Sequence, residues 1–388
     1  MEWKEVRLGD VCSKITDGSH FSPKAQTEGY PMLSVKDMRE YDFDFSNCKK
    51  ISYEDYLKME RDGCVPQIGD VLVAKDGSYL KEIFICKEQR EIALLSSIAI
   101  FRPNSQLIDS RFLCYCLKSP RVYNYISLNC VSGSALPRII LKDFKGVNIR
   151  VPSLDDQRRI ASILSSLDRK IELNNKINAD LEEMAQAIFK NWFVDFEPFK
   201  DGKFVDSELG MIPEGWKVGR LGELCNFKRG KNLLTKNAID EGVPVVAGGL
   251  EPSCFHNVAN TGAPVITVSG SGANAGFMRM YHVPVWASDC SFIDISCENF
   301  YFVYCFLKVN SKLLKHAQTG AVQPHVKPSD IHDFELVIPD KESIYDFQDK
   351  VNPFFDKIAS IQKENSRLSL LRDTLLPRLM SGELEIPE

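Results

Sequence analysis

The sequence has no long apolar run. None of its 388 residues lies in a stretch that approaches the roughly 18 uncharged apolar residues of a membrane-spanning helix. The opening residues do not follow the order of a secretion signal, in which an apolar segment comes after a basic one. We therefore expect a cytoplasmic protein.

Patterns of metal ligands are also missing. The chain has 12 cysteines, but there is no Cys-x-x-Cys, and the closest pair is Cys114 and Cys116. The 6 histidines are dispersed, with no His-x-x-x-His. We expect reduced cysteines that act as small apolar residues, and no metal site.

No catalytic or cofactor motif is complete. Gly270–Gly276 has neither the Gly-Lys-Ser/Thr ending of a phosphate loop nor Gly-x-Gly-x-x-Gly spacing, so a tight turn is expected there, whose backbone could approach DNA phosphates. Asn352-Pro353-Phe354-Phe355 lacks the second proline of the adenine-methyltransferase motif. We expect Asn352 to cap a helix with Pro353 in its first turn, or Pro353 to mark a kink. No catalytic residue and no cofactor is predicted.

What is present is a globular composition, with 44% hydrophobic and 26% charged residues, in a chain long enough for two domains. The net charge of −5 is unevenly distributed. The acid excess lies in residues 151–212 and 339–388, whereas residues 1–150 and 213–338 are almost neutral. Because DNA contact needs only a local basic surface, the total does not exclude DNA binding.

The chain is an internal repeat. Trp3-Lys-Glu-Val-Arg-Leu-Gly-Asp-Val-Cys12 recurs as Trp216-Lys-Val-Gly-Arg-Leu-Gly-Glu-Leu-Cys225, and Gly133–Pro137 recurs as Gly320–Pro324. Each copy begins with strand-like segments that run into glycine turns, such as those at 70–75 and 264–269. Each copy then ends in one long helical segment.

Both helical segments carry a heptad stripe in the same register. The stripe of the first segment runs from Ile160 to Trp192, and the second follows it 187 residues later. The residues expected to pair the helices are Ile160, Leu164, Leu167, Ile171, Asn178, Leu181, Ile188, Phe347, Val351, Phe354, Ile358, Ile361, Asn365, Leu368 and Leu375.

Two helices that pack on each other explain this shared length and phase, with Asn178 and Asn365 fixing the register. The alternative is two ordinary core helices in separate domains. The expected fold is α+β: two similar mixed α/β domains joined by two long antiparallel coiled-coil helices, with a pseudo-twofold internal repeat. The expected segments are a first domain at 1–150, a first helix and connector at 151–212, a second domain at 213–338, and a second helix and tail at 339–388.

Such a helix pair could act as a ruler on DNA. A helix over 160–192 is about 50 Å long at ~1.5 Å per residue. Because one turn of B-DNA is about 34 Å, the two domains could meet one face of the duplex a turn or more apart. Domains that share a frame but differ inside would read different half-sites.

The run from Gln157 through the helix to Trp192-Phe-Val-Asp-Phe-Glu-Pro198 resembles the central conserved region of Type I restriction-modification specificity subunits. Ile212-Pro-Glu-Gly-Trp216, Asp17-Gly-Ser-His20 and Leu371–Glu383 are similar to other recurrent segments of that family. The resemblance implies two target recognition domains on an antiparallel helical spacer. It also implies double-stranded DNA with a bipartite site, two methyltransferase subunits and restriction-translocase subunits as partners, and no activity of the chain itself.

DNA contacts are expected on loops, where Arg, Lys, Asn and Gln can read bases and where cations and backbone amides can meet phosphates. The candidates in the first domain are Lys14, Thr16, Asp17, Ser19, His20, Lys75, Asp76, Ser78, Ser132, Ser134 and Arg138. The candidates in the second domain are Lys228, Arg229, Lys231, Ser269, Ser271, Asn274, Gln323, His325 and Lys327. Taken singly, each of them is more often an ordinary surface group.

Two other functions stay open at this point. The chain could be a DNA methyltransferase or nuclease with an unrecognised active site, which turnover by the isolated chain would reveal. It could also be a coiled-coil protein scaffold, which sequence-dependent DNA protection would exclude.

Overall fold

The computed structural model describes residues 2–133, 137–319, 324–384 and 386. The chain divides into two compact units. Unit 1 holds the residues up to Asn174 and those from Glu364 onward, and unit 2 holds Asn175–Lys363. Each long helix contributes one part to each unit. The four segments expected from the sequence stay a prediction. The pseudo-twofold relation of the two units stays a prediction.

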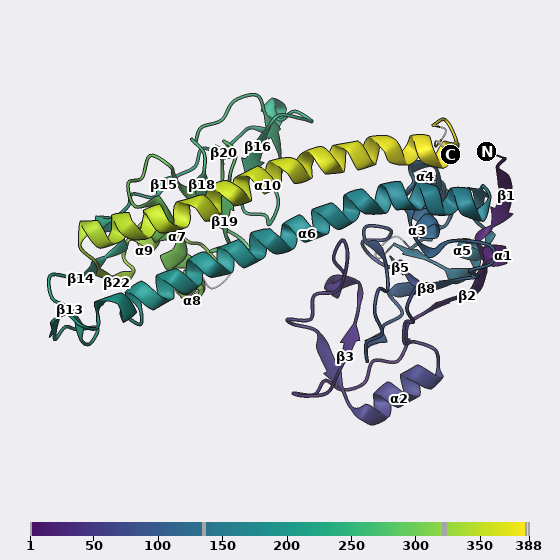
Figure 1. Ribbon diagram of the computed structural model, residues 1–388, viewed down its shortest axis with the longest axis horizontal. Coiled ribbons are helices and arrows are strands. Elements are labelled where there is room, and N and C mark those ends of the chain that lie inside the picture. Colours follow the sequence, from purple (N-terminus) through teal and green to yellow (C-terminus); the bar gives the residue numbers. More distant parts are fainter. Residues whose placement is uncertain (1, 134–136, 320–323, 385, 387–388) are drawn as a thin grey trace. The chain divides into compact units, whose positions relative to one another are not determined.

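Besides its parts of the long helices, unit 1 consists of short strands and helices that precede the first long helix (Figure 1). Its strands are β1 (Lys4–Arg7), β2 (Cys12–Asp17), β3 (Tyr30–Leu33), β4 (Lys49–Ile51), β5 (Val71–Ala74), β6 (Ile83–Ile85), β7 (Ala93–Leu94), β8 (Ile98–Pro103), β9 (Val131–Ser132), β10 (Arg138–Ile139) and β11 (Asn148–Val151). Its helices are α1 (Leu8–Val11), η1 (Val35–Asp37), α2 (Tyr53–Arg61), α3 (Ser110–Lys118), α4 (Pro120–Asn129) and α5 (Leu141–Gly146).

Unit 2 is also built from short strands and helices. Its strands are β12 (Phe204–Val205), β13 (Ile212–Pro213), β14 (Lys217–Arg220), β15 (Lys228–Arg229), β16 (Val243–Val246), β17 (Cys254–His256), β18 (Val265–Ser269), β19 (Met278–Tyr281), β20 (Trp286–Ala287), β21 (Cys290–Asp294) and β22 (Glu335–Ile338). Its helices are η2 (Glu197–Phe199), η3 (Leu221–Glu223), η4 (Thr235–Asn237), α7 (Phe300–Val309), α8 (Ser311–His316) and α9 (Pro328–His332).

Three sheets of unit 1 have counterparts in unit 2, whereas, among the described residues, the pairs β10-β9 and β12-β13 each occur in one unit. A four-stranded sheet has the order β2-β8-β5-β6 in unit 1 and β15-β21-β18-β19 in unit 2. A three-stranded sheet has the order β4-β3-β7 in unit 1 and β17-β16-β20 in unit 2. A two-stranded pair closes each domain, β1 with β11 and β14 with β22. The expected internal repeat of mixed α/β domains is thereby confirmed.

The long helices are α6 (Leu154–Phe193) and α10 (Lys341–Ser381). In unit 1, Ile160 of α6 shares a hydrophobic cluster with Leu379 of α10, while Asn174 donates a hydrogen bond to Asn365 at 2.7 Å. In unit 2, the ring centroids of Phe193 and Phe347 lie 5.2 Å apart. In unit 1, contacting residue numbers rise along α6 as they fall along α10. The helices are therefore antiparallel, as expected.

The buried stripe drifts from the expected heptad positions. Leu167, Ile188 and Trp192 are only half-buried, whereas their neighbours Asp168, Phe189 and Phe193 are buried. In α10, the buried residues are Phe355 and Leu376 rather than Phe354 and Leu375. A helix of 3.6 residues per turn drifts past a repeat of 3.5, and each half of the pair also packs against its own domain.

The remaining positions of the stripe fall into three groups. Ile160, Leu164, Ile171, Phe347, Val351, Ile358 and Ile361 are buried. Leu181, Asn365 and Leu368 are half-buried. The side-chain oxygen of Asn178 is buried without a hydrogen-bond partner among the described residues, and Asn174 is the residue that bonds to Asn365. The complete set of helix-pairing residues stays a prediction.

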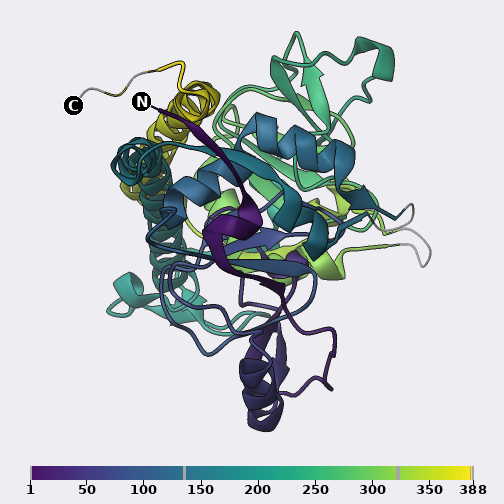
Figure 2. The ribbon, with the colours of Figure 1, turned by 90° about the vertical axis from the view of Figure 1, so that its right-hand side faces the viewer.

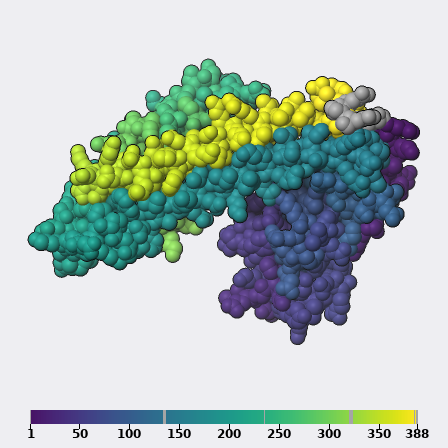
Figure 3. Space-filling view, in the orientation of Figure 1, coloured from purple at the N-terminus to yellow at the C-terminus, as the bar shows by residue number. Residues whose placement is uncertain are grey.

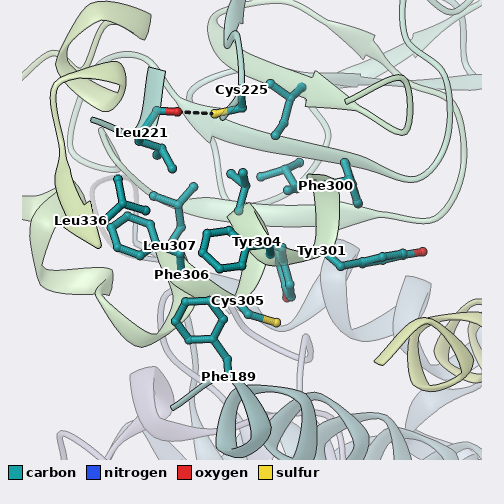
Figure 4. Close-up of a cluster of buried hydrophobic side chains, with 14 of the residues drawn as sticks. Phe189, Leu221, Cys225, Phe300, Tyr301, Tyr304, Cys305, Phe306, Leu307 and Leu336 are labelled. Carbon is teal, nitrogen blue, oxygen red and sulfur yellow. Dashed lines mark hydrogen bonds between the residues drawn. The ribbon is translucent and has the colours of Figure 1, made fainter. Parts of the chain in front are cut away.

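Aromatic residues dominate the core of unit 2 (Figure 4). Phe189 reaches from α6 toward α7, and its ring centroid lies 5.2 Å from that of Phe302 and 6.5 Å from that of Phe306. In unit 1, the core lies between the four-stranded sheet, helices α3 to α5 and the end of the helix pair. Each domain is therefore anchored to its own portion of the helix pair.

The beginning and the end of the described chain meet within unit 1 (Figure 2). A side chain added at Gly382 would place its Cβ 2.5 Å from the indole nitrogen of Trp3. Trp3 also packs against Phe112, and the guanidinium of Arg150 lies 5.6 Å from its ring centroid. Both ends of the chain thus contribute to one core.

The expectation for Asn352 and Pro353 as the start of a helix is wrong. α10 begins at Lys341, where Asp340 accepts a hydrogen bond from the Ser343 backbone N–H at 2.8 Å. Pro353 therefore lies inside a helix, where it cannot donate the backbone hydrogen bond of that turn. Within the described residues, all twelve cysteines are free, and no helix has the length and apolar character needed to cross a membrane.

Candidate nucleic-acid interface

Three loops of unit 1 that carry sequence candidates meet beside the four-stranded sheet. Asp17 ends β2, and Lys75 and Asp76 follow β5. Asp76 forms an isolated β-bridge with Arg138, and the Ile139 backbone N–H donates to the Lys75 carbonyl at 3.0 Å. We call Asp17, His20, Lys75, Asp76 and Arg138 the unit 1 loop cluster.

Lys75 is the centre of this cluster, and it is buried. Its ammonium lies 3.4 Å from an Asp17 carboxylate oxygen and 3.0 Å from an Asp76 oxygen. His20 reaches Asp17 at 3.3 Å and is largely exposed. Because two carboxylates neutralise Lys75, it is poorly suited to meet a phosphate. Arg138 is the exposed cation of the cluster.

Unit 2 brings its candidate loops together in the same way. Ser271 forms a β-bridge with His325, and the Val326 backbone N–H donates to the Gly270 carbonyl at 3.1 Å. Arg229, at the end of β15, forms an ion pair with Asp289, which also accepts a hydrogen bond from Ser271. We call Arg229, Gly270, Ser271, Asp289 and His325 the unit 2 loop cluster.

Exposed cations surround the unit 2 loop cluster. Lys228 and Lys231, on either side of Arg229, are exposed, and neither forms an ion pair with a described residue. Burial raises the pKa of the nearby Cys290 thiol to about 12, so this sulfur stays protonated and adds no negative charge. The unit 2 loop cluster therefore has cations beside it that are unpaired among the described residues, whereas the central cation of the unit 1 loop cluster is buried and paired.

The two clusters occupy equivalent places, but their ion pairs have opposite polarity. Asp17 lies opposite Ala99 in its sheet, and Arg229 lies opposite the equivalent residue Ser291. In unit 1, strand β2 supplies the acid, and in unit 2 the equivalent strand β15 supplies the guanidinium.

A bulge explains why the repeat is offset by one residue here. The pairing of β2 with β8 is irregular between Cys12 and Lys14, where the first copy contains one extra residue. Gly18 and Gly230 then become equivalent. A Cβ at Gly18 would lie 2.2 Å from the Leu94 carbonyl oxygen, and one at Gly230 would lie 2.1 Å from that of Ser288. Both positions therefore require glycine for close approach of two backbones.

The structure places the remaining candidates around these clusters. Ser269 is buried, and its hydroxyl donates to the Gly248 carbonyl at 3.2 Å. The half-buried candidates are Lys14, Thr16, Ser19 and Asn274. The exposed candidates are Ser78, Ser132 and Lys327. Ser134 and Gln323 lie outside the described residues.

Sequence reasoning missed Asp289 and Gly248. Asp289 directly precedes strand β21, and Gly248 follows strand β16. Neither residue belongs to a motif, and only the folded sheet brings them near Arg229. The described residues also contain no group of three or more His, Cys, Asp or Glu residues arranged to hold a metal ion.

The family of the chain follows from its comparison with known proteins. The model of the Type I restriction modification DNA specificity domain matches residues 1–183 and again residues 213–369. The two matches correspond to the two copies of the repeat. The chain belongs to the family of Type I restriction-modification specificity subunits.

Curated relatives agree with this assignment, and one solved structure shares the fold. The chain is 33% identical to the MjaIX specificity subunit of Methanocaldococcus jannaschii, over 72% of this chain and 70% of that protein. It is 25% identical to the HindI specificity subunit of Haemophilus influenzae, over 99% of this chain and all of that protein. The crystal structure of an S subunit from M. genitalium shares the fold, with a TM-score of 0.55 and 19% identity over 98% of this chain and 96% of that one.

These findings support the main hypothesis from the sequence and not its alternatives. The chain is the DNA-specificity subunit of a Type I restriction-modification system, with two DNA specificity domains and two long helices. Its family is that of the non-catalytic subunit of these systems.

Proposed function

We propose that the unit 1 and unit 2 loop clusters contact double-stranded DNA, each on one half of a bipartite site. The observation that carries this proposal is the repeated construction of one loop junction with different charged residues. Equivalent backbone positions hold Asp17 and Lys75 in unit 1 but Arg229 and Gly270 in unit 2. Two different half-sites require different side chains on the same backbone arrangement.

The charge of each cluster supports a division of roles. Lys228 and Lys231 suit phosphate oxygens, because exposed cations release counterions when they neutralise phosphates. In unit 1, the carboxylate of Asp76 can accept a hydrogen bond from the amino group of cytosine or adenine. The two domains therefore differ in salt dependence as well as in sequence preference.

The helix pair supplies the surface for the other subunits. In each unit, α6 and α10 lie side by side, and their outer sides are uncovered in the space-filling view (Figure 3). We propose that two methyltransferase subunits bind there, that the pair sets the spacer between half-sites, and that restriction-translocase subunits join the full complex. The active site for methyl transfer then belongs to those subunits and not to this chain.

The cationic loop offers a direct test. The triple variant Lys228→Gln, Arg229→Gln and Lys231→Gln, assembled with the methyltransferase subunits, should bind its DNA more weakly. The slope of log affinity against log salt should flatten by up to about 0.9 for each lost phosphate contact. The measurement is fluorescence anisotropy of a labelled duplex at several salt concentrations.

A charge-matched variant controls for the change in net charge. Lys200→Gln, Lys203→Gln and Lys217→Gln remove three cations from the connector after α6 and from β14, and the salt slope should stay unchanged. An unaltered affinity and slope in the Lys228, Arg229 and Lys231 variant would remove this loop from the interface.

Methylation sequencing tests the whole proposal in the cell. A two-part methylated-adenine motif should be present with the chain and absent after its deletion. Turnover by the isolated chain would instead favour an enzyme, and the absence of sequence-dependent DNA protection by the complex would favour a protein scaffold.

A further inference from the structure

We infer that Arg229 reads a guanine base in the half-site bound by unit 2, with Asp289 and Gly270 as its positioning residues. This inference rests on the proposed function and adds the chemistry of one contact. It separates Arg229 from the neighbouring Lys228 and Lys231, which carry the same charge but are held differently.

The first observation is that Arg229 is held in place while it remains accessible. Its side chain is 44% exposed, and its Nη2 donates to Asp289 Oδ1. The other carboxylate oxygen of Asp289 accepts a hydrogen bond from the Ser271 hydroxyl. Both oxygens of Asp289 are therefore engaged, which holds the carboxylate in place and anchors the Nη2 end of the guanidinium.

The second observation is that the backbone leaves space for this guanidinium. A Cβ at Gly270 would lie only 2.1 Å from Arg229 Nη1. The Gly270 backbone N–H donates to the Asp289 carbonyl at 3.1 Å, so the two supporting residues are also joined to each other. Any side chain at position 270 would displace the end of Arg229.

The third observation is a further glycine behind Asp289. A Cβ at Gly248 would lie 2.9 Å from the Ser271 carbonyl and 3.7 Å from Asp289 Oδ2. The Gly248 carbonyl accepts hydrogen bonds from Ser269 at 3.2 Å and Asn274 at 3.4 Å. Residues from three loops thus build one rigid support for a single arginine.

This arrangement favours a base over a phosphate as the DNA group that Arg229 contacts. A phosphate contact needs only positive charge, and the carboxylate of Asp289 reduces the net charge that Arg229 offers. Among the described residues, the guanidinium bonds only to Asp289, so its other N–H groups remain as donors. A planar fork of donors that is anchored at one end matches the O6 and N7 acceptors of guanine in the major groove.

In unit 1, the equivalent position does not hold an arginine. The position equivalent to Arg229 is Asp17, whose carboxylate faces the buried ammonium of Lys75. The unit 1 loop cluster therefore cannot read guanine through this position. The inferred contact belongs to one half-site only.

The experiment uses the chain assembled with its methyltransferase subunits and a duplex library in which the unit 2 half-site is randomised. Arg229→Gln should relax the preference at one G·C pair by about 5- to 150-fold and leave the other positions unchanged. Lys231→Gln should instead weaken binding equally on all sequences.

Gly270→Ala tests the positioning role without removing the arginine. The three atoms nearest to the added methyl group all belong to the far end of the flexible Arg229 side chain, so the fold should be retained while the same G·C preference is lost. Gly262→Ala is the matched control, because its Cβ would lie at an ordinary 3.4 Å from Asp294 and should leave the preference intact.

Asp289→Asn should change specific and non-specific binding in opposite directions, which would not happen if Asp289 only stabilised the fold. The preference at the G·C pair should fall, while binding to unrelated DNA should tighten and its salt dependence steepen, because Arg229 regains its full charge. Equal loss on all sequences by Arg229→Gln, with a flatter salt slope, would identify a phosphate contact and overturn the inference. Failure of the unaltered assembly to bind DNA would instead refute the proposed function itself.

Discussion

The two units attach their domains to the helix pair by different chemistry. In unit 1, Asp168 of α6 lies 2.9 Å from Arg372 of α10 and accepts hydrogen bonds from Tyr115 at 2.5 Å and Tyr41 at 3.3 Å. The corresponding repeat positions in unit 2, 187 residues away, are Phe355 and Ala185, both fully buried.

The aromatic junction of unit 2 is built by stacking. The ring of Phe355 lies 4.6 Å from that of Tyr301, nearly parallel to it, and 5.5 Å from that of Tyr304. A repeated backbone therefore accepts either an ion pair with hydrogen bonds or a packed aromatic cluster. The polar version is tolerated because the buried carboxylate of Asp168 has both an ionic partner and hydrogen-bond donors. Burial and this carboxylate also raise the pKa of Tyr115 well above its ordinary value, so its hydroxyl stays a donor.

The largest effect is expected from the aromatic junction. Phe355→Ala should lower the free energy of unfolding of unit 2 by about 3–5 kcal/mol, because the removed ring leaves a cavity in a closely packed core. Native-state hydrogen exchange of the β18 and β21 amides measures this loss. Leu370→Ala, at a residue 70% exposed, is the control and should change little. An equal loss of protection in β5 and β8 would show that the two units do not unfold separately.

The polar junction should be broken by Arg372→Ala. This variant leaves the buried carboxylate of Asp168 without its ionic partner, and we expect unit 1 to lose about 3 kcal/mol of stability. The exchange of the β5 and β8 amides should report it. Arg378→Ala, which removes an exposed pair with Glu383, should cost less than about 1 kcal/mol. Similar losses of stability in the two variants would mean that the buried ion pair of the junction contributes no more than an exposed ion pair.

A smaller change separates the hydrogen bond from the ion pair. Tyr115→Phe keeps the ring of Tyr115 and removes the hydroxyl that donates to Asp168. We expect a loss of about 1.5–2 kcal/mol in unit 1, typical of a hydrogen bond to a charged group. Thermal unfolding of this variant and of Tyr304→Phe in unit 2 compares the two junctions, and a larger effect of the Tyr304 change would contradict the comparison.

The starts of the two long helices should differ in their response to acid. Burial raises the pKa of Asp340, but the Ser343 backbone N–H, the Trp216 indole N–H and the Ser343 hydroxyl donate to its carboxylate and lower it below its ordinary value. The folded pKa thus lies below the unfolded value of about 3.9. Its stabilising contribution is complete above that pH and is lost as the pH falls through the folded pKa.

Ser153 holds the equivalent position before α6, where its neutral hydroxyl accepts the Asp156 backbone N–H at 3.2 Å. Asp340→Ser should therefore remove part of the acid sensitivity of unit 2 at a cost of at most about 1 kcal/mol at neutral pH. Unfolding measured at pH 6 and pH 3 for both proteins checks this. If the free energy of unfolding changed equally between pH 6 and pH 3 in both proteins, Asp340 would be excluded as the source of the acid sensitivity.

Much of the fold was predictable because the repeat and the helical register are local patterns. The strands at 71–74 and 265–269 and the helices over 160–192 and its repeat were all anticipated. Arg372 falls on the apolar stripe of the second helical segment, but the sequence did not indicate its partner. Its partner Asp168 was missed because Leu167 fits a strict heptad better than its neighbour.

The sequence predicted which loops form the candidate interface, but it did not predict which residues contact each other there. The sequence marked the loops around Lys75, Arg229 and Ser271, and the fold brings each set together. It gave no sign that Lys75 is buried between two carboxylates, because Asp17 is distant in sequence. Asp289 and Gly248 belong to no motif, so only the sheet topology reveals their relation to Arg229.

By itself, the sequence determined the duplication, the element order and the paired helices, because hydrophobic periodicity and turn residues act over short distances along the chain. The tertiary structure alone decided which charges are exposed and which are neutralised. Those relations depend on distances between segments far apart in sequence, and the energy of a charge depends on its partners and its burial.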